Sequence, residues 1–216
     1  MLLGPLRHRF TALERAKEQG IGHYFVPRYT RVVDTAESKD NINKAYNLIS
    51  TSKVRNEMII DDVITCVARK QTPVILTRFK EHAKFLHDAL KKKADHVFLL
   101  YGDNSDKENA EIRVKLKQIP ENESLILVAT GQKIGEGFDF PRLDVLMLAA
   151  PVSFEGRLEQ YVGRLNRDYV GKEAVYVYDY IDSHVRYFDK MYAKRLRTYR
   201  KMGFSIWTQE LQPKQI

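Results

Sequence analysis

The 216-residue chain lacks the residues that build covalent or metal-bound scaffolds. Its one cysteine, Cys66, excludes an internal disulfide and any cysteine-clustered metal site, which suits a reducing, cytoplasmic location. The six histidines show no metal-ligand spacing with acidic neighbours, so we expect no metal site. No run reaches the roughly 18 apolar residues of a membrane span. The first ten residues are too short and too polar for a signal peptide, and no membrane partner is expected.

The sequence also lacks a complete loop for cradling nucleotide phosphates. The pattern G-x-x-x-x-G-K-[ST] does not occur, because the only Gly-Lys pair, Gly171-Lys172, is followed by Glu173. A D-E-x-[DH] box, which would hold Mg²⁺, is missing as well. The first apolar run is not followed by G-x-G-x-x-G, which disfavours a Rossmann-like enzyme acting on small molecules. This chain alone is therefore not expected to hydrolyse ATP.

What the chain has in excess is positive charge. Its 36 Lys and Arg against 28 Asp and Glu give a net charge of +8 and an isoelectric point near 9.4. Such a field attracts polyanions, of which nucleic acid is the commonest, although a merely soluble basic protein would have the same composition. The 44% apolar content supplies one large core.

Short apolar runs alternate with amphipathic stretches from about residue 52 onward. This alternation predicts an α/β, three-layer domain with a mainly parallel sheet flanked by helices. The polar stretch SKDNINK interrupts the pattern, so residues 1–38 are interpreted as an N-terminal extension or the end of a preceding domain, and 39–216 as the main domain. The expected strands are 73–77, 96–101, 125–130, 144–150 and 174–181, and the expected helices are 54–70, 80–93, 106–118, 155–166 and 185–201.

Candidate ligand-binding residues follow the strands, because ligands of open parallel sheets lie at the carboxyl ends of the strands. The strand 125–130 is followed by GQKIGEGFDFP, in which the glycines allow tight turns and Asp139 can accept hydrogen bonds. A plain strand-to-helix turn would have the same composition. The helix 155–166 and its end carry Gln160, Arg164 and Arg167 at offsets of four and three, which we expect to share one face. Guanidinium groups suit phosphate, although a solvated basic face is the alternative.

Three stretches resemble motifs of superfamily 2 helicases. QYVGRLNR (160–167) resembles motif VI, ILVATGQKIGEGFDFP resembles motif V, and PVILTRFKEHAKFL resembles motif IV, in the expected order. LLYGDNS resembles the strand and glycine turn that follow motif IV. The match spans about residues 53–182, nearly the whole RecA-like second lobe of the motor, which is a P-loop NTPase-like fold. The wording of the motifs is closest to bacterial helicases of the restriction-enzyme or DEAD/DEAH type.

The resemblance implies a role for each matching residue. By motif VI, Arg164 and Arg167 would be arginine fingers at the γ-phosphate of ATP, with Gln160 orienting that site. Similarity to motif V implies that residues of the glycine-rich loop approach the nucleotide. Similarity to motifs IV and V implies that residues at the strand ends contact the nucleic-acid backbone. The implied nucleotide-binding residues are Gly135, Gly137 and Asp139, and the implied nucleic-acid-binding residues are Thr77, Arg78, Gly102 and Thr130. In the commonest DEAD-box form, motif VI begins with His and Arg, whereas this chain has Gln160 and Tyr161 at those positions.

The missing phosphate loop and Mg²⁺-holding acid belong to the first lobe in this family, and the resemblance implies that residues 1–38 are the end of that lobe or the hinge. The chain therefore resembles the second motor lobe of an ATP-dependent nucleic-acid helicase or translocase, part of an NTP hydrolase. Its cofactor would be ATP with Mg²⁺, shared with a first RecA-like lobe in the same or a partner chain. Its substrate would be nucleic acid, DNA rather than RNA. The alternative is a non-catalytic nucleic-acid-binding module without ATP turnover.

The remaining polar residues fall on expected helices. The helix 185–201 is amphipathic, and its basic stripe would either track phosphates or be a solvated face over the sheet. We expect His82 and His87 at the surface or at helix caps, Asp61 and Asp62 as a solvated pair, and Cys66 in the core. The basic stripe consists of Arg186, Lys190, Lys194, Arg197 and Lys201.

Overall fold

The fold is an α/β lobe built on one seven-stranded parallel sheet, seen in a computed structural model that describes residues 20–101, 106–131, 139–152, 155–167 and 169–207. The strands lie in the order β3-β4-β2-β5-β6-β1-β7, and each neighbouring pair is parallel. Their bounds are β1 (Gly22–Tyr29), β2 (Pro73–Thr77), β3 (His96–Leu100), β4 (Leu125–Thr130), β5 (Val145–Leu148), β6 (Ala174–Ile181) and β7 (Ser205–Ile206).

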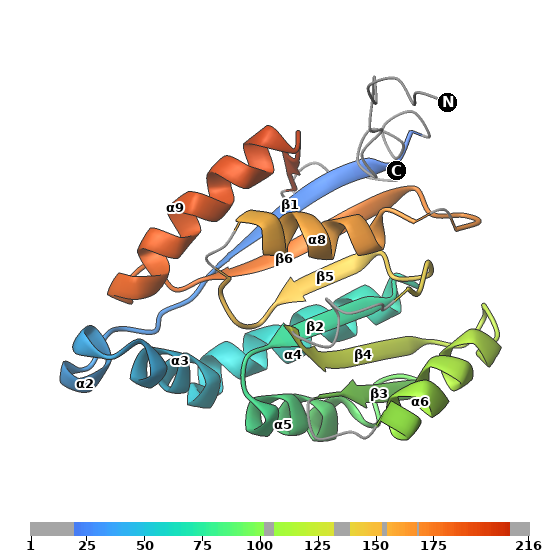
Figure 1. The fold of residues 1–216 in the computed structure, drawn as a ribbon, viewed down its shortest axis with the longest axis horizontal. Coiled ribbons are helices and arrows are strands. Elements are labelled where there is room, and N and C mark those ends of the chain that lie inside the picture. Colours follow the sequence, from blue (N-terminus) through green and yellow to red (C-terminus); the bar gives the residue numbers. More distant parts are fainter. Residues whose placement is uncertain (1–19, 102–105, 132–138, 153–154, 168, 208–216) are drawn as a thin grey trace, which may run out of the picture.

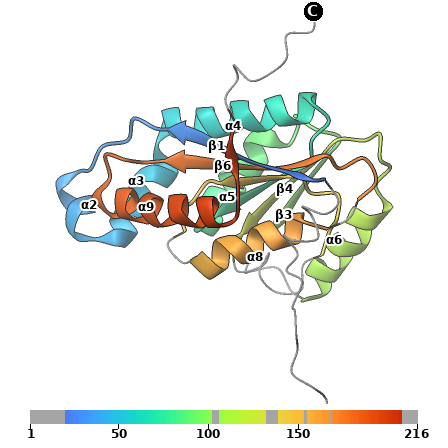
Figure 2. The same ribbon diagram turned by 90° about the horizontal axis from the view of Figure 1, so that it is seen from above.

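Helices cover both faces of this sheet, as Figure 2 shows from above. Helices α4 and α5 lie on one face, and α6, α8 and α9 lie on the other (Figure 1). The predicted three-layer, RecA-like α/β fold is therefore confirmed. The helices are α2 (Ala36–Asp40), α3 (Ile42–Thr51), α4 (Lys53–Ala68), α5 (Lys80–Leu90), α6 (Asp106–Gln118), α8 (Glu155–Leu165) and α9 (Arg186–Lys201).

The central strands are buried on both faces, which is why their sequences are continuous apolar runs. All residues of β2 and β5 are buried, as are the first five of β4. Burial of each such Val, Leu or Ile side chain contributes roughly 1.5–3 kcal/mol. The helix residues that complete the two cores include Ile59 and Leu86 on one face and Leu158 and Tyr199 on the other.

Residues 36–51 form two short helices where the sequence had indicated a break in pattern. Thr35 and Ser38 exchange side-chain and backbone hydrogen bonds in a capping box that starts α2. The side chain of Asn41 accepts hydrogen bonds from the backbone N–H groups of Asn43 and Lys44 and so starts α3. The polar residues that interrupted the pattern are thus helix caps, and α3 still buries an apolar face that includes Tyr46.

The described residues before 39 contribute strand β1, which lies between β6 and β7. Its register with β6 runs from Gly22 opposite Ala174 to Tyr29 opposite Ile181. These residues are therefore continuous in space with the sheet, although the sequence had set them apart. Partners so distant along the chain leave no local pattern from which the pairing could be predicted.

Two polar residues expected at the surface are buried, and that expectation was wrong. Asp62 is 9% exposed, because it pairs with Nε of Arg28 at 2.8 Å and accepts a hydrogen bond from the Tyr180 hydroxyl at 3.0 Å. His82 is 5% exposed and bonds to Asn56. Cys66 lies in the core as expected, where burial raises the pKa of its thiol to about 12.

None of the helices in the described ranges combines the length and the apolar character that crossing a bilayer requires.

Candidate functional site

The carboxyl ends of β2 and β4 lie side by side and bring two predicted nucleic-acid contacts together. Thr77 and Thr130 are directly opposed in the register of these strands. Thr130 is half-buried, whereas Thr77 is buried and its hydroxyl donates to the carbonyl of Phe79 at 3.2 Å. The Thr77 side chain is thus already engaged within the protein. The predicted contact at Gly102 lies outside the described residues.

Arg78, directly after β2, is exposed at this edge. Its guanidinium lies 4.3 Å from the centroid of the Tyr46 ring, and Nη2 is 3.5 Å from the side-chain oxygen of Asn43. A guanidinium stacked on a ring keeps the donors of its planar fork directed outward, in its own plane. This arrangement suits recognition of phosphate oxygens.

Helix α8 separates core residues from polar ones. Its apolar face, which includes Leu158 and Val162, is buried, whereas Gln160 is exposed and Arg164 is partly exposed. The helix ends at Leu165, so Arg167 stands beyond it and not on the helical face that its spacing predicted. Two interactions hold the chain where the helix ends. Asn166 bonds to His23 at 2.9 Å, and Nζ of Lys172 donates to the carbonyls of Leu165 and Arg167.

The end of α8 meets the segment that follows the glycine-rich loop. Nε of Arg167 is 3.5 Å from a carboxylate oxygen of Asp139, with side chains 49% and 55% exposed. An ion pair this exposed is weak, roughly 0–1 kcal/mol, so either partner can exchange it for a ligand. Two predicted site residues from separate motifs are thereby neighbours. Gly135 and Gly137 lie outside the described residues.

A second contact joins α8 to the carboxyl end of β4. The hydroxyl of Tyr161 donates to the carbonyl of Gly131 at 3.0 Å. A Cβ atom at Gly131 would lie 2.6 Å from that hydroxyl oxygen, which is closer than atoms tolerate. Glycine at this position therefore permits the close approach of α8 to the strand end.

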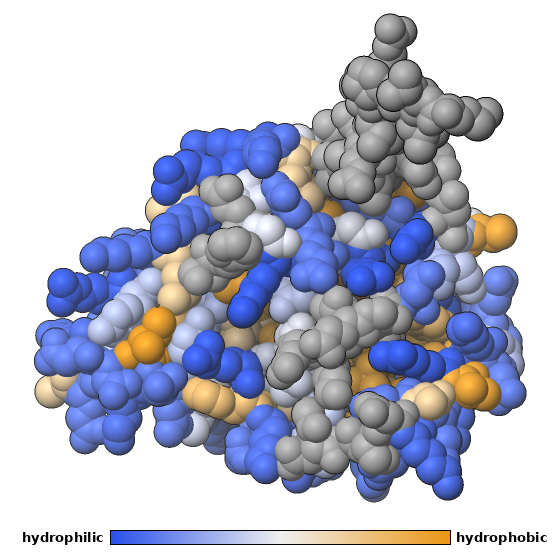
Figure 3. Space-filling model, viewed as in Figure 1, coloured by the Kyte–Doolittle hydropathy of each residue, from blue (hydrophilic) through white to orange (hydrophobic). Residues whose placement is uncertain are grey.

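The basic stripe of α9 is exposed along its length, and the surface over this helix is largely hydrophilic in Figure 3. The opposite side is buried, as the amphipathic pattern predicted: Tyr199 packs on the sheet and Phe188 packs against Tyr46 of α3. The exposed charge is compatible with both interpretations of the stripe, phosphate tracking and simple solvation.

Sequence reasoning missed two buried arginines behind the site. Arg55 forms two hydrogen bonds with Asp182, at 2.9 and 3.1 Å, with both side chains fully buried. Arg195 forms two with Asp179, at 2.7 and 2.9 Å. Neither arginine has a local sequence signal, because Asp179 in β6 and Asp182 directly after β6 are brought near only by the fold.

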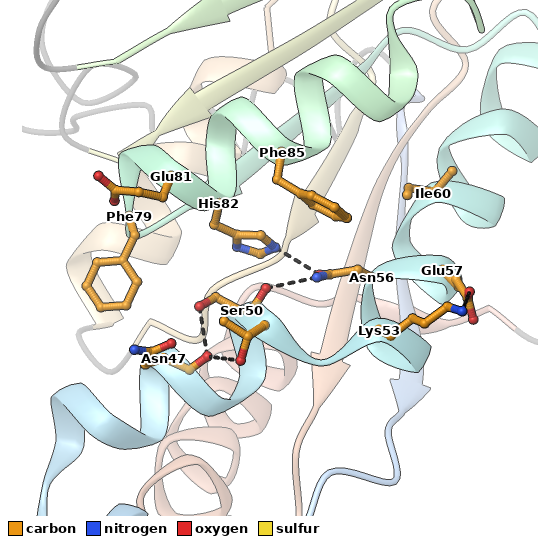
Figure 4. A pocket seen from close by; sticks show the side chains of 11 residues that line it. Asn47, Ser50, Lys53, Asn56, Glu57, Ile60, Phe79, Glu81, His82 and Phe85 are labelled. Carbon is orange, nitrogen blue, oxygen red and sulfur yellow. Dashed lines mark hydrogen bonds and ion pairs between the residues drawn. The ribbon is translucent and has the colours of Figure 1, made fainter.

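A hollow of about 850 Å³ lies among α3, α4 and α5, and Figure 4 shows the side chains that line it. Phe79 and Phe85 are among its walls, and His82 bonds through Nε2 to the Asn56 side-chain oxygen at 2.9 Å. Asn56 in turn donates to the carbonyl of Ser50 at 2.8 Å. Burial, and to a lesser extent the charge of Arg55, lower the pKa of His82 to about 3, so this imidazole is neutral at physiological pH. In the described part of the chain, no group of three or more His, Cys, Asp or Glu residues could hold a metal ion.

Comparisons with known proteins point to one family. The helicase conserved C-terminal domain matches residues 54–168. The chain is 28% identical over 172 residues to the transcript termination protein A18 of Yaba-like disease virus, covering 74% of this chain and 35% of that protein. It is 34% identical over 118 residues to putative helicase 161L of Invertebrate iridescent virus 6, covering 54% of this chain and 22% of that protein.

A solved structure shares the fold. The crystal structure of T4 UvsW superposes with a TM-score of 0.65 at 20% identity, over 87% of this chain and 41% of that one. The chain thus spans about a third or less of the curated relatives it matches.

Proposed function

The chain belongs to the family of helicase conserved C-terminal domains, and from this premise we propose that it is the second motor lobe of an ATP-dependent nucleic-acid helicase or translocase. A lobe of this kind completes two sites that a first lobe begins. One is an ATP site in the cleft between the lobes, and the other is a track for a nucleic-acid strand. A first lobe, in the same or a partner chain, would supply the phosphate loop and the Mg²⁺ ligands that this sequence lacks.

The observation that carries the proposal is the approach of Arg167 to Asp139 at the end of α8. A guanidinium beside an exposed carboxylate fits a nucleotide, because guanidinium donors suit phosphate oxygens and a carboxylate accepts from ribose hydroxyls. Arg164 and Arg167 would bind the γ-phosphate, Gln160 would orient this site, and Asp139, with Gly135 and Gly137, would face the ribose. The nucleotide supplies the phosphoanhydride bond whose hydrolysis drives movement of the lobes.

The proposed nucleic-acid contacts lie at the carboxyl edge of β2 and β4. Arg78 would bind a backbone phosphate, and Thr130, Thr77 and Gly102 would line the same track. Because the Thr77 hydroxyl donates to Phe79, we expect Thr77 to act through its backbone or its lone pairs. The net charge of +8 would favour association with either DNA or RNA.

The sharpest test compares arginine variants in a protein that contains both lobes. Arg164→Ala or Arg167→Ala is expected to lower ATP turnover by at least ~10²-fold while leaving nucleic-acid affinity largely intact. Arg69→Ala, which removes an exposed arginine at the end of α4, is the matched control and should leave turnover near the wild-type value. Unchanged turnover in both α8 variants would refute the assigned role.

A binding-only module is the second candidate, favoured by the exposed basic stripe of α9 and the missing phosphate loop. Purified residues 1–216 should bind oligonucleotides and show no appreciable ATP turnover in either case. The candidates separate when a first lobe is supplied, because only the motor lobe would then increase ATP turnover.

We propose DNA on the wording of the motifs, which resembles that of restriction-type helicases. The viral relative described as a transcript termination protein instead favours a role at a transcript. Competition between single-stranded DNA and RNA of the same sequence for the chain would decide between them.

A further inference from the structure

The turn between β5 and α8 is held by side chains from three other elements. A backbone carbonyl that accepts a hydrogen bond from a fixed side chain cannot shift without breaking that bond. This turn leads directly into the helix that carries Gln160 and Arg164. Nη1 of Arg55 in α4 donates to the carbonyl of Ala149 at 2.8 Å, and the hydroxyl of Tyr46 in α3 donates to the carbonyl of Pro151 at 2.8 Å. Nη1 of Arg195 in α9 donates to the carbonyl of Val152 at 3.1 Å.

Of these three donors, Tyr46 differs from the two arginines in what lies behind it. Arg55 and Arg195 are each anchored to a buried aspartate, so they fix the turn to the interior of the lobe. The Tyr46 ring instead carries the exposed guanidinium of Arg78, whose Cζ lies 4.3 Å from the ring centroid. Tyr46 therefore contacts Arg78 over its ring and near its hydroxyl, and the same hydroxyl contacts the turn.

The hydroxyl of Tyr46 acts as a donor in this contact. Burial raises the pKa of Tyr46 and the charge of Arg78 lowers it by less, so the phenol keeps its proton. The hydroxyl lies 2.8 Å from the carbonyl oxygen of Pro151 and 3.7 Å from Sδ of Met191, and because a thioether is the weaker acceptor, the hydroxyl donates to Pro151. The ring is packed in the core against Phe188, with centroids 4.8 Å apart, and a rigid ring held in this way moves as a unit.

We propose that Tyr46 is a positioning residue that couples the occupancy of Arg78 to the orientation of α8. The inference rests on the proposed function, because it takes Arg78 to bind a strand phosphate. Binding of phosphate redirects the guanidinium and changes its stacking on the ring, and the hydroxyl at the other end of the ring transmits this change to Pro151. A strand at the carboxyl edge of β2 thereby adjusts the arginines at the end of α8.

The experiment measures amide hydrogen exchange in α8 of this chain, with and without a saturating single strand of about 15 thymidines or uridines. Binding of the strand is expected to change exchange in the α8 peptides of the wild type. Tyr46→Phe removes only the hydroxyl and leaves the ring beneath Arg78. This variant should bind the strand with similar affinity and lose the exchange response in α8. Tyr192→Phe removes a half-buried tyrosine hydroxyl elsewhere, 3.5 Å from that of Tyr29, and should respond as the wild type does.

A purely structural role of Tyr46 predicts a different result. Tyr46→Phe would then change amide exchange in α8 by the same amount with and without the strand, so the response to the strand would be kept. That outcome overturns the proposal, as does a full response in Tyr46→Phe or no response in the saturated wild type. A second variant, Arg78→Lys, keeps the charge but not the planar stack. At saturation it should also lose the response in α8, and a full response in this variant would contradict the coupling. If the wild type binds neither strand, the proposed function fails first, and the separate affinity measurement reveals it.

Discussion

Replacing Arg195 with methionine is expected to destabilise the lobe by about 3–5 kcal/mol, because the change leaves the Asp179 carboxylate buried without its partner. The two side chains are only 3% and 0% exposed. Burial by itself would lower the pKa of Arg195, but Asp179 raises it and the net shift is upward, so the guanidinium is charged. After the change, the Tyr199 hydroxyl at 3.1 Å would still donate to Asp179, which is too little to solvate a buried charge.

Urea unfolding followed by circular dichroism measures this loss as a lower midpoint at unchanged slope. Adding Asp179→Leu to Arg195→Met removes the orphaned charge and should restore part of the stability. Lys201→Met is the control, because its pair with Glu159 is exposed, at 69% and 41%, and its removal should cost no more than about 0.5 kcal/mol. A loss below about 1 kcal/mol for Arg195→Met would refute the reasoning from burial.

Three further predictions concern pH, a close contact and salt. The pKa of His82 is about 3 in the folded state, below its usual value near 6.5, so the unfolded state binds the proton first and stability falls as pH drops below about 6.5. Between pH 7 and pH 5 the free energy of unfolding of His82→Gln should therefore fall by about 1–2 kcal/mol less than that of the wild type, as measured by urea unfolding, and equal losses would contradict the assignment. Gly131→Ala should destabilise by about 1–2 kcal/mol, and Tyr161→Phe in the same chain should recover most of it, whereas a neutral single variant would show that the contact relaxes. Lys190→Gln with Lys194→Gln should reduce the slope of log affinity against log salt for a single strand by about 1.4 if both contact phosphate, and an unchanged slope would place α9 away from the strand.

The sheet and most helices could be predicted because their signals are local. Strands buried on both faces must be apolar at every position, so β2, β4 and β5 stand out in the sequence. Helices α2 and α3 could not be recognised in this way. Thr35 and Asn41 are caps, and a cap has the same polar composition as a loop.

The candidate site shows the same division between local and distant information. The spacing of Gln160 and Arg164 places them on the polar side of α8, as the structure has it. The contact between Arg167 and Asp139 depends on where the helix ends, which the periodicity alone did not reveal. The functional roles of these residues stay predictions. The donors to the β5–α8 turn could not be found at all, because their partners are backbone carbonyls, which any sequence possesses.

The position of β1 in the sheet has a consequence for the order in which the chain folds. Strand β1 emerges from the ribosome before any other described strand, yet its partners β6 and β7 are made last. The backbone hydrogen-bonding groups of β1 stay unpaired while the four intervening strands are synthesised, and β5 has an unpaired edge until β6 is synthesised. Such long-range pairing is slow and leaves strand edges exposed to wrong partners. Truncation before residue 174 would therefore release a nascent sheet with an apolar edge, which is prone to aggregation or to capture by chaperones.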